Sequence, residues 1–468
     1  MLFSSMTFLF VFMPLVMAVY FLSKKEIRNY VLLIASIIFY AWGEPRYLAI
    51  MIITILVNYA GAILLDKHYS SRQRLWIVSL TIVLDLSFLF YFKYFNFVVD
   101  NINGVLTTDF QLLDVIMPIG ISFYTFQAMS YLIDVYRREV PAQKDIYKLA
   151  LYIVLFPQLV AGPIVKYHDV CEQIDNRTIE FKNVIIGFKR FITGLAKKVL
   201  IANTLAEVVD KIFAQAPENL TTGVSWLGAV AYCLQLYYDF SGYSDMAIGL
   251  GLMFGFRFLE NFNYPYISKS ITEFWRRWHI SLATWFKLYL YIPLGGNRKG
   301  AVRTYWNLFA VFLVTGIWHG AAWSYVAWGI WNGIFIVIER FFGLDKDKND
   351  RWYVSAAKHV YAFFAIVWGM IIFRAESLSY AYEYICRMLH IDVTKHLPDY
   401  DYGVNNKFAI MLIVGLICAM PVCRNLIYIQ YEHKVQRTLV NIWLFLLFFW
   451  STISLAASTY NPFIYFRF

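Results

Sequence analysis

Apolar runs recur along the whole chain and are separated by short polar stretches. They cover residues 8–22, 30–42, 47–65, 75–92, 115–133, 148–165, 225–256, 304–323, 325–338, 354–373, 408–423 and 438–458. A membrane-spanning helix needs about 20 apolar residues, so the pattern predicts roughly ten to twelve crossings, several of them short or re-entrant. Because a chain in lipid must satisfy its own backbone hydrogen bonds, we expect an all-α integral membrane protein.

Two stretches, residues 166–212 and 257–303, are too polar for simple spans and too aromatic for ordinary loops. They are typical of amphipathic, interfacial or half-inserted helices. Irregular backbone is tolerated at membrane depth only where protein or a water-filled cavity surrounds it, so we expect an internal cavity. The sequence shows no internal repeat or flexible linker, and residues 1–468 are expected to form a single domain.

Charge in the polar stretches predicts the orientation of the first five spans. Residues 24–28, 67–74 and 137–148 are basic, whereas residues 101–114 contain no Lys or Arg. Cytoplasmic loops carry the excess Lys and Arg of membrane proteins, so the N-terminus is predicted to lie outside. Lys24 and its basic neighbours follow the first apolar run, whereas a secretory signal has its charge before that run.

Composition supports this class and excludes several others. Of the 468 residues, 60% are hydrophobic and 15% charged, against about 45–50% and about 25% in soluble domains. The net charge of +10 lies largely between apolar runs, which favours membrane orientation over nucleic-acid binding. The five cysteines are scattered without CxxC or zinc-like spacing, so no disulfide framework is expected.

One histidine, His319, lies inside an apolar run, in Thr315-Gly-Ile-Trp-His-Gly-Ala-Ala-Trp323. No charged residue occurs between Tyr305 and Glu339, so the imidazole must be hydrogen-bonded or face a cavity. The small residues beside it either leave room for a ligand or let helices pack closely. The sequence leaves both readings open.

A second histidine, His279, ends the string Phe274-Trp-Arg-Arg-Trp-His279, which is expected to be buried or interfacial because its apolar residues wrap a helix. Arg276 and Arg277 either reach lipid head groups or meet the phosphates of a carrier. The Gly-rich turn that follows carries Arg298 and Lys299 but lacks the spacing of a phosphate-binding loop.

A polar stripe runs through the apolar segment 235–260. Tyr237, Ser241 and Asp245 follow at four-residue spacing, which places them on one helix face. Such a stripe lines either a cavity or a hydrogen-bonded helix contact, and the sequence does not choose between them.

The two histidines suggest proton transfer more than metal binding. A catalytic zinc site normally has three protein ligands, and no third ligand stands at a fixed spacing here, so no metal is expected. A histidine titrates near working pH, which suits it to take a proton from a hydroxyl group as a general base.

Seven strings carry a resemblance to a known family over nearly the whole chain. They are Met1-Leu-Phe-Ser-Ser5, Pro118-Ile-Gly-Ile-Ser-Phe-Tyr-Thr-Phe126, Phe156-Pro-Gln-Leu-Val-Ala-Gly-Pro163, Tyr238-Asp-Phe-Ser-Gly-Tyr-Ser-Asp245, Phe274-Trp-Arg-Arg-Trp-His279, Trp318-His-Gly320 and Asn461-Pro-Phe-Ile-Tyr-Phe-Arg-Phe468. Together they resemble the membrane-bound O-acyltransferase (MBOAT) superfamily, and within it the bacterial polysaccharide branch of the alginate O-acetyltransferase type.

The resemblance implies a ring of membrane helices around a tunnel that links a cytoplasmic acyl donor to an extracytoplasmic acceptor. His319 matches the catalytic histidine of the superfamily, and His279 matches its second polar active-site position. The expected tunnel residues are Trp318, Tyr237, Ser241, Asp245 and Asn332, the last standing where many alginate-type relatives carry histidine. The expected donor-binding residues are Arg276, Arg277, Arg298 and Lys299.

The implied activity is transfer of an acyl group, acetyl before others, for O-acetylation of a polysaccharide or wall polymer. The donor is expected to be acetyl-coenzyme A or an acyl carrier protein thioester, with no bound cofactor. The implied partner at the cytoplasmic membrane is an extracytoplasmic serine esterase-like (SGNH) acetyltransferase. D-alanyl transfer to teichoic acid is the alternative within the family. A polytopic transporter or a non-enzymatic export scaffold is the alternative from another class, although the repeats common in transporters are not evident.

Overall fold

The computed structural model describes residues 1–67, 70–160, 162–344, 350–390, 400–423, 434–458 and 460–463, and these ranges contain helices but no strands. The predicted all-α class is therefore confirmed. The chain divides into two compact units, one of Met1–Phe191 with Ser244–Leu259 and one of Ile192–Tyr243 with Glu260–Phe468. Each unit is described by itself.

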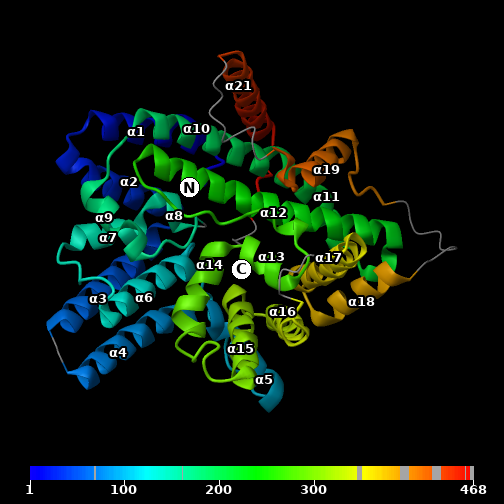
Figure 1. Cartoon of the computed structure of the whole chain (residues 1–468), viewed down its shortest axis with the longest axis horizontal. Helices are drawn as coiled ribbons and strands as arrows, with labels where there is room; N and C mark the ends of the chain where they lie inside the picture. The colour runs from blue at the N-terminus through cyan, green and yellow to red at the C-terminus, as the bar shows by residue number, and fades with distance from the viewer. Residues whose placement is uncertain are drawn as a thin grey trace. The chain divides into compact units, whose positions relative to one another are not determined.

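Nine α-helices lie wholly within the described residues of unit 1. They are α1 (Met13–Leu22), α2 (Arg28–Gly43), α3 (Leu48–Lys67), α4 (Ser71–Leu89), α5 (Phe95–Leu106), α6 (Ile121–Arg137), α7 (Ile146–Val154), α8 (Phe156–Leu159) and α9 (Tyr167–Asn176). The helices α3, α4 and α6 pack side by side, and α2 packs on α7 (Figure 1). Aromatic rings fill the core beneath α2, where Phe8, Phe39 and Phe156 lie within 6.3 Å of one another.

The apolar run 148–165, predicted as one span, forms two short helices instead. Helix α7 ends at Val154, Leu155 leaves the helical conformation, and α8 begins at Phe156 with Pro157 in its first turn. Proline has no backbone N–H to donate and disfavours helical geometry in the residue before it, so a continuous helix through Pro157 is penalised.

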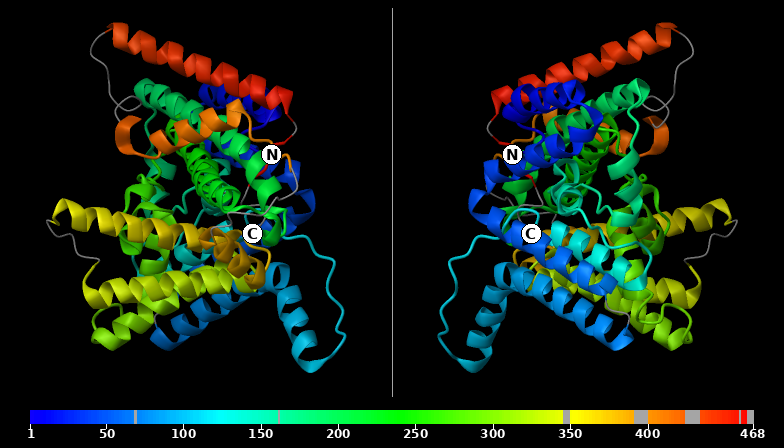
Figure 2. Two further views of the ribbon diagram at one scale, coloured as in Figure 1. Left: turned by 90° about the vertical axis from the view of Figure 1, so that its right-hand side faces the viewer. Right: turned by 90° about the vertical axis from the view of Figure 1, so that its left-hand side faces the viewer.

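Helix α5 and the extended segment after it project from the neighbouring helices of unit 1, as Figure 2 shows. Val105 is 82% exposed, and Phe110, Leu112 and Ile116 are also exposed. This projecting part contains the segment 101–114, which has no Lys or Arg.

Helices α10 (Phe181–Ala196) and α12 (Thr222–Met253) contribute residues to both units. Among the described residues, the helices that belong wholly to unit 2 are α11 (Asn203–Phe213), α13 (Ile271–Arg277), α14 (Ile280–Phe286), α15 (Ala301–His319), α16 (Trp323–Phe342), α17 (Trp352–Arg374), α18 (Leu378–Leu389), α19 (Asn406–Cys418) and α21 (Lys434–Ala457). In this unit α15 and α16 form a closely packed hairpin, and α16 also contacts α13 and α17.

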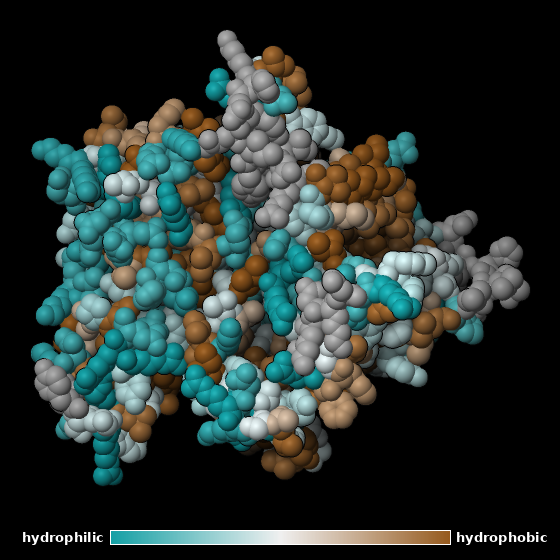
Figure 3. Space-filling model, in the orientation of Figure 1, coloured by the Kyte–Doolittle hydropathy of each residue, from teal (hydrophilic) through white to brown (hydrophobic). Residues whose placement is uncertain are grey.

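Within the described ranges, four segments are long and apolar enough to cross a membrane, and two shorter helices are also apolar. The long ones are Pro45–Lys67, Ser71–Leu106, Trp352–Arg374 and Val435–Ala457, and the shorter ones are Phe8–Leu22 and Asn406–Cys418. This number is lower than the predicted ten to twelve crossings. The run 148–165 forms two short helices, whereas the runs 225–256, 304–323 and 325–338 form α12, α15 and α16, which are long helices outside this apolar set. Apolar side chains gather on the visible surface of α19, where Ile410 and Ile413 are more than half exposed (Figure 3).

Candidate active site

His279 lies at the junction of α13 and α14, and its backbone is in the left-handed region with φ of 45°. Positive φ is uncommon for a residue other than glycine, and such strain persists where the surroundings hold it. The side chain is 1% exposed. The string that the sequence predicted as one buried helix is thus two short helices with His279 at the bend.

Asn261 holds this bend from the neighbouring segment of unit 2. Its Oδ1 lies 3.1 Å from His279 Nδ1 and accepts hydrogen bonds from the backbone N–H and the hydroxyl group of Ser281, at 3.2 and 2.9 Å. Its backbone carbonyl accepts the N–H of Ile280 at 3.0 Å. One asparagine therefore fixes three consecutive residues, 279–281.

These contacts define the proton arrangement of the His279 ring. Because Asn261 Oδ1 already accepts the Ser281 N–H, it is the carbonyl oxygen of the amide, and His279 Nδ1 must donate to it. Nε2 then carries the lone pair and, among the described residues, has no hydrogen-bond partner. His279 lies outside the long apolar segments, and its burial lowers its pKa to about 3, so the ring is neutral at working pH.

Aromatic rings from α12 and the loop before α13 enclose the His279 bend. The Phe240 ring meets the imidazole edge-on with ring centres 4.6 Å apart. Tyr237, expected in the tunnel lining, packs against Phe262, Tyr266 and Trp278 at 5.9, 5.5 and 6.2 Å. The surroundings of His279 are therefore buried and largely aromatic.

His319 is the last residue of α15 and is 6% exposed. Its ring lies 5.0 Å from Trp318, 5.0 Å from Trp328 of α16 and 5.3 Å from Phe373 of α17. Three aromatic side chains from three helices thus surround this imidazole.

The glycines beside His319 serve helix packing. A Cβ on Gly316 would lie 2.4 Å from the carbonyl oxygen of Tyr325, and one on Gly320 would lie 2.2 Å from the Tyr325 ring. Real Cβ atoms do not approach so closely, so only glycine lets α15 and α16 meet here. Of the two readings left open by the sequence, close packing explains these two glycines.

Helix α16 connects the surroundings of the two histidines. The Trp328 ring that contacts His319 also contacts Trp275 of α13 at 5.4 Å. Trp275 Nε1 donates to Asn332 Oδ1 at 3.0 Å, and Asn332 Nδ2 donates to the Trp328 carbonyl at 2.8 Å. Asn332, expected in the tunnel lining, therefore joins α13 to α16.

The polar stripe of α12 is buried throughout. Asp245 pairs with Arg190, whose Nη2 and Nε lie 2.9 and 3.1 Å from its Oδ1, which makes Asp245 part of a helix–helix ion pair. Ser241 Oγ is buried and has no hydrogen-bond partner among the described residues. Asp245 therefore belongs to a contact between helices, which is one of the two roles that the sequence left open for the stripe.

The four expected donor-binding cations differ in their surroundings. Arg277 is half-buried, pairs with Glu273 at 2.9 Å and donates to the Asn263 carbonyl at 3.1 Å. Arg276, Arg298 and Lys299 are exposed. The described residues contain no group of three or more His, Cys, Asp or Glu side chains that could hold a metal ion.

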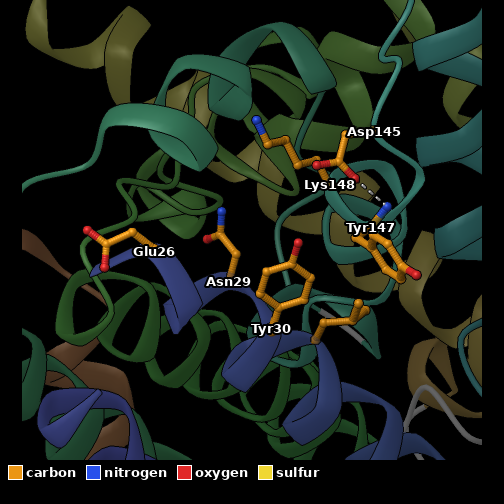
Figure 4. Close-up of a pocket in the computed structure, with 7 residues that line it drawn as sticks. Glu26, Asn29, Tyr30, Asp145, Tyr147 and Lys148 are labelled. Atoms are coloured by element: carbon orange, nitrogen blue, oxygen red, sulfur yellow. Dashed lines mark hydrogen bonds between the residues drawn. The ribbon is translucent and has the colours of Figure 1, made fainter. Parts of the chain in front are cut away.

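A separate pocket with about 350 Å³ of empty space lies in unit 1 (Figure 4). Glu26, Asn29 and Tyr30 line it from the start of α2 and the turn before it, and Asp145, Tyr147 and Lys148 line it from the start of α7. The rings of Tyr30 and Tyr147 are 5.7 Å apart. The pocket therefore lies between two segments predicted to be cytoplasmic, 24–28 and 137–148.

The family model described as "MBOAT, membrane-bound O-acyltransferase family" matches residues 37–378, which include both histidines and all of the helices that surround them. The chain belongs to the membrane-bound O-acyltransferase family. The resemblance noted from the sequence is confirmed, and the protein is an O-acyltransferase of the membrane.

Curated MBOAT relatives match the chain at full or partial length. "Probable alginate O-acetylase AlgI" of Pseudomonas putida is 43% identical, with 100% of each chain covered. "Peptidoglycan O-acetyltransferase" of Helicobacter pylori is 32% identical over 92% of this chain and 89% of its own. "Teichoic acid D-alanyltransferase" of Bacillus subtilis is 28% identical over 55% of this chain and 69% of its own.

Three residues that contact the two histidines or hold the helix beside them were missed by sequence reasoning. Asn261, Trp328 and Glu339 lie in no string with a recognisable spacing to the histidines. A signal existed only for Glu339, which closes a long apolar run as its first charged residue.

Proposed function

We propose that this protein moves an acetyl group from a cytoplasmic thioester across the cytoplasmic membrane to a hydroxyl group of an extracytoplasmic polysaccharide. The similarity to an alginate O-acetylase over 100% of both chains carries this proposal. A peptidoglycan O-acetyltransferase also matches over most of the chain. The D-alanyl transferase covers only 55% of it, which favours acetyl over D-alanyl transfer.

In this proposal His319 is the general base. As the acceptor oxygen attacks the thioester carbonyl carbon, a C–O bond forms, the C–S bond breaks, and the hydroxyl proton passes to the imidazole. The proton then passes to the departing thiolate, which leaves as a thiol. General-base assistance of this kind is worth about 10²–10⁴-fold in rate, and the three aromatic rings around His319 favour it by excluding water.

His279 is proposed to orient a reacting group. Its pKa of about 3 makes it a weak proton acceptor, whereas its Nε2 lone pair is fixed in direction by the Nδ1 bond to Asn261. A fixed acceptor can hold a hydroxyl group or a donor N–H in one direction, which lowers the entropy cost of reaching the reactive geometry.

The donor is proposed to be acetyl-coenzyme A, bound through its phosphates by Arg276, Arg298 and Lys299. Their exposure leaves their charges available to an anion. Arg277 is proposed to shape this region, because Glu273 already neutralises its charge. An extracytoplasmic serine esterase-like (SGNH) protein is proposed to accept the acetyl group or to deliver it to the polymer.

Thioester consumption by purified protein tests the proposal. The protein is reconstituted in lipid nanodiscs with radiolabelled acetyl-coenzyme A and an oligomannuronate acceptor, and free thiol and labelled sugar are measured. We expect turnover by the wild type, and a loss of at least about 10²-fold in His319→Ala. His359→Ala is the matched control, because His359 is exposed on α17 and is expected to be silent.

The outcomes separate the proposed classes. Absence of thioester consumption by the wild type would support a transporter or export scaffold instead. Thiol release with a carrier-protein thioester but not with coenzyme A would change the donor and keep the mechanism. Full activity of His319→Ala would remove His319 from the reaction.

A further inference from the structure

Glu339 is a fully buried carboxylate near the end of α16, with 0% of the residue exposed. Its Oε1 accepts the backbone N–H of Ile271 at 2.6 Å and the hydroxyl of Tyr361 at 3.0 Å, and its Oε2 accepts the N–H of Thr272 at 2.8 Å. Burying a carboxylate is costly unless hydrogen bonds satisfy it. Here two backbone groups and one side chain do so.

The two backbone donors are the first two residues of α13. The opening N–H groups of a helix have no hydrogen-bond partner within it. Glu339 accepts both of these N–H groups from a different helix. The third N–H group, that of Glu273, donates to the hydroxyl oxygen of Ser270 at 3.0 Å. A helix of 7 residues is too short to be stable alone, so the position of α13 depends on α16.

A second hydrogen bond from the same side of α16 fixes the middle of α13. Asn332 precedes Glu339 by two helical turns and accepts the Trp275 indole N–H at 3.0 Å. Trp328, one turn before Asn332, contacts both Trp275 and His319 at ring distances of 5.4 and 5.0 Å. The face of α16 that holds α13 at two points is therefore the face that touches His319.

His279 follows the end of α13 after one extended residue, so its location depends on where α13 lies as well as on its bond to Asn261. We propose that Glu339 is a positioning residue that fixes His279 relative to His319 through the start of α13. This role rests on the proposed function, in which both histidines act on one reaction. Glu339 does not touch the reacting atoms and acts through the backbone of Ile271 and Thr272.

Glu339→Gln tests this role because it keeps the shape of the side chain and replaces one acceptor oxygen with an NH₂ group. One of the two α13 N–H groups then faces a donor. We expect kcat to fall about 10²-fold, the effect of a displacement near 1 Å at a reacting group, while the donor KM stays within about twofold.

Tyr361→Phe is the matched control. It removes the third hydrogen bond to the same carboxylate and leaves both bonds to α13. Because α13 keeps its two anchors, we expect kcat to stay within about threefold of the wild type. Equal losses of kcat in Tyr361→Phe and Glu339→Gln would show that burial of the carboxylate matters and that positioning of α13 does not.

A chemical readout separates positioning from general destabilisation. Diethyl pyrocarbonate modifies accessible imidazoles, and mass spectrometry reports the peptides that contain His279 and His319 separately. In Glu339→Gln we expect faster modification of His279 by about fivefold or more, with His319 changed less than about twofold, because local opening exposes one site only. Equal acceleration of both histidines would indicate loosening of the whole unit and would overturn the proposal.

The wild type and His319→Ala accompany these variants in the thioester assay. If the wild type fails to turn over, the proposed function is wrong. If the wild type is active, His319→Ala is inactive and Glu339→Gln keeps its kcat, then the proposed function stands and the positioning role of Glu339 is wrong.

Discussion

The two buried histidines differ in what their rings contact. Asn261 fixes one nitrogen of His279 by a side-chain hydrogen bond, and burial keeps the ring neutral. His319 lies at a helix end among the rings of Trp318, Trp328 and Phe373. A ring held by an amide suits orientation of a ligand, whereas proton transfer requires a pKa nearer to working pH. This difference favours the division of roles that we propose.

Protonation of His279 provides a prediction for stability against pH. Its pKa falls from 6.5 to about 3 on burial, so the unfolded chain binds a proton more readily than the folded one. The stability from this group is complete above pH 6.5 and is lost as the pH falls toward 3. Within that window, each fall of one pH unit lowers the free energy of unfolding by about 1.4 kcal/mol. The Tm of the wild type should therefore drop more between about pH 7 and pH 5 than that of His279→Gln, measured in one detergent.

Parallel drops in Tm for the two proteins would contradict this assignment, because glutamine takes up no proton in that range. The control is His359→Gln, the same change at an exposed position. The same reasoning predicts that the acid limb of the rate profile belongs to a group other than His279.

The exposed cations in the last turn of α13 and in the turn before α15 give a prediction for the donor. A triple variant should raise the KM for acetyl-coenzyme A about tenfold or more and change kcat little, as expected when uniform binding is lost. It combines Arg276→Ala, Arg298→Ala and Lys299→Ala. Arg277→Ala is the comparison, since its charge is already paired with Glu273. A donor titration on nanodisc samples measures both. An unchanged KM in the triple variant would identify these cations as lipid anchors.

At the scale of elements, the α15–α16 hairpin depends on glycine where its helices cross. A methyl group at position 316 would meet the Tyr325 carbonyl at 2.4 Å and Gly329 Cα at 2.9 Å. Gly316→Ala must therefore push the helices apart, and overpacking of this kind costs about 1–3 kcal/mol. We expect a lower Tm by thermal scanning and a lower kcat, because His319 lies one turn later on α15.

Gly223→Ala is the matched control for this effect. Gly223 lies in the first turn of α12, and a Cβ there has nothing within 4 Å. Alanine in a helix is favoured over glycine by about 0.5–1 kcal/mol, so Tm should hold or rise. A Gly316→Ala protein with an unchanged Tm would mean that the hairpin adjusts without cost.

The sequence predicted helices better than it predicted their ends and their contacts. Long apolar periods located α3, α4 and α17 because hydrophobic length is a local property. The break at Leu155 and the bend at His279 depend on a proline in one case and on Asn261 in the other. His319 was recognisable as an isolated imidazole in an apolar run. Glu339 was not, since its backbone partners lie 67 and 68 residues away in the chain.

At the scale of the whole molecule, contacts in unit 1 bear on the orientation in the membrane. The Arg74 guanidinium, from the basic segment 67–74, donates to the carbonyls of Val135 and Tyr136, just before the basic segment 137–148. In the pocket of Figure 4, the start of α7, which belongs to the segment 137–148, lies opposite residues 26–30. The segment 137–148 therefore lies beside both other basic segments, as expected if all three face the same side of the membrane.

Labelling of single cysteines tests that orientation and the direction of acyl flow. In a variant whose native cysteines are replaced, Val105→Cys and Arg72→Cys place a thiol at two exposed positions, one at each end of the Ser71–Leu106 segment. This segment is long enough to cross the membrane, so we predict that its ends lie on opposite sides. An impermeant maleimide on intact cells should label Val105→Cys, and Arg72→Cys only after permeabilisation, because basic loops stay in the cytoplasm. Labelling of Arg72→Cys alone on intact cells would show that the topology is the inverse of the predicted one. The acyl donor would then have to reach the protein from the opposite side.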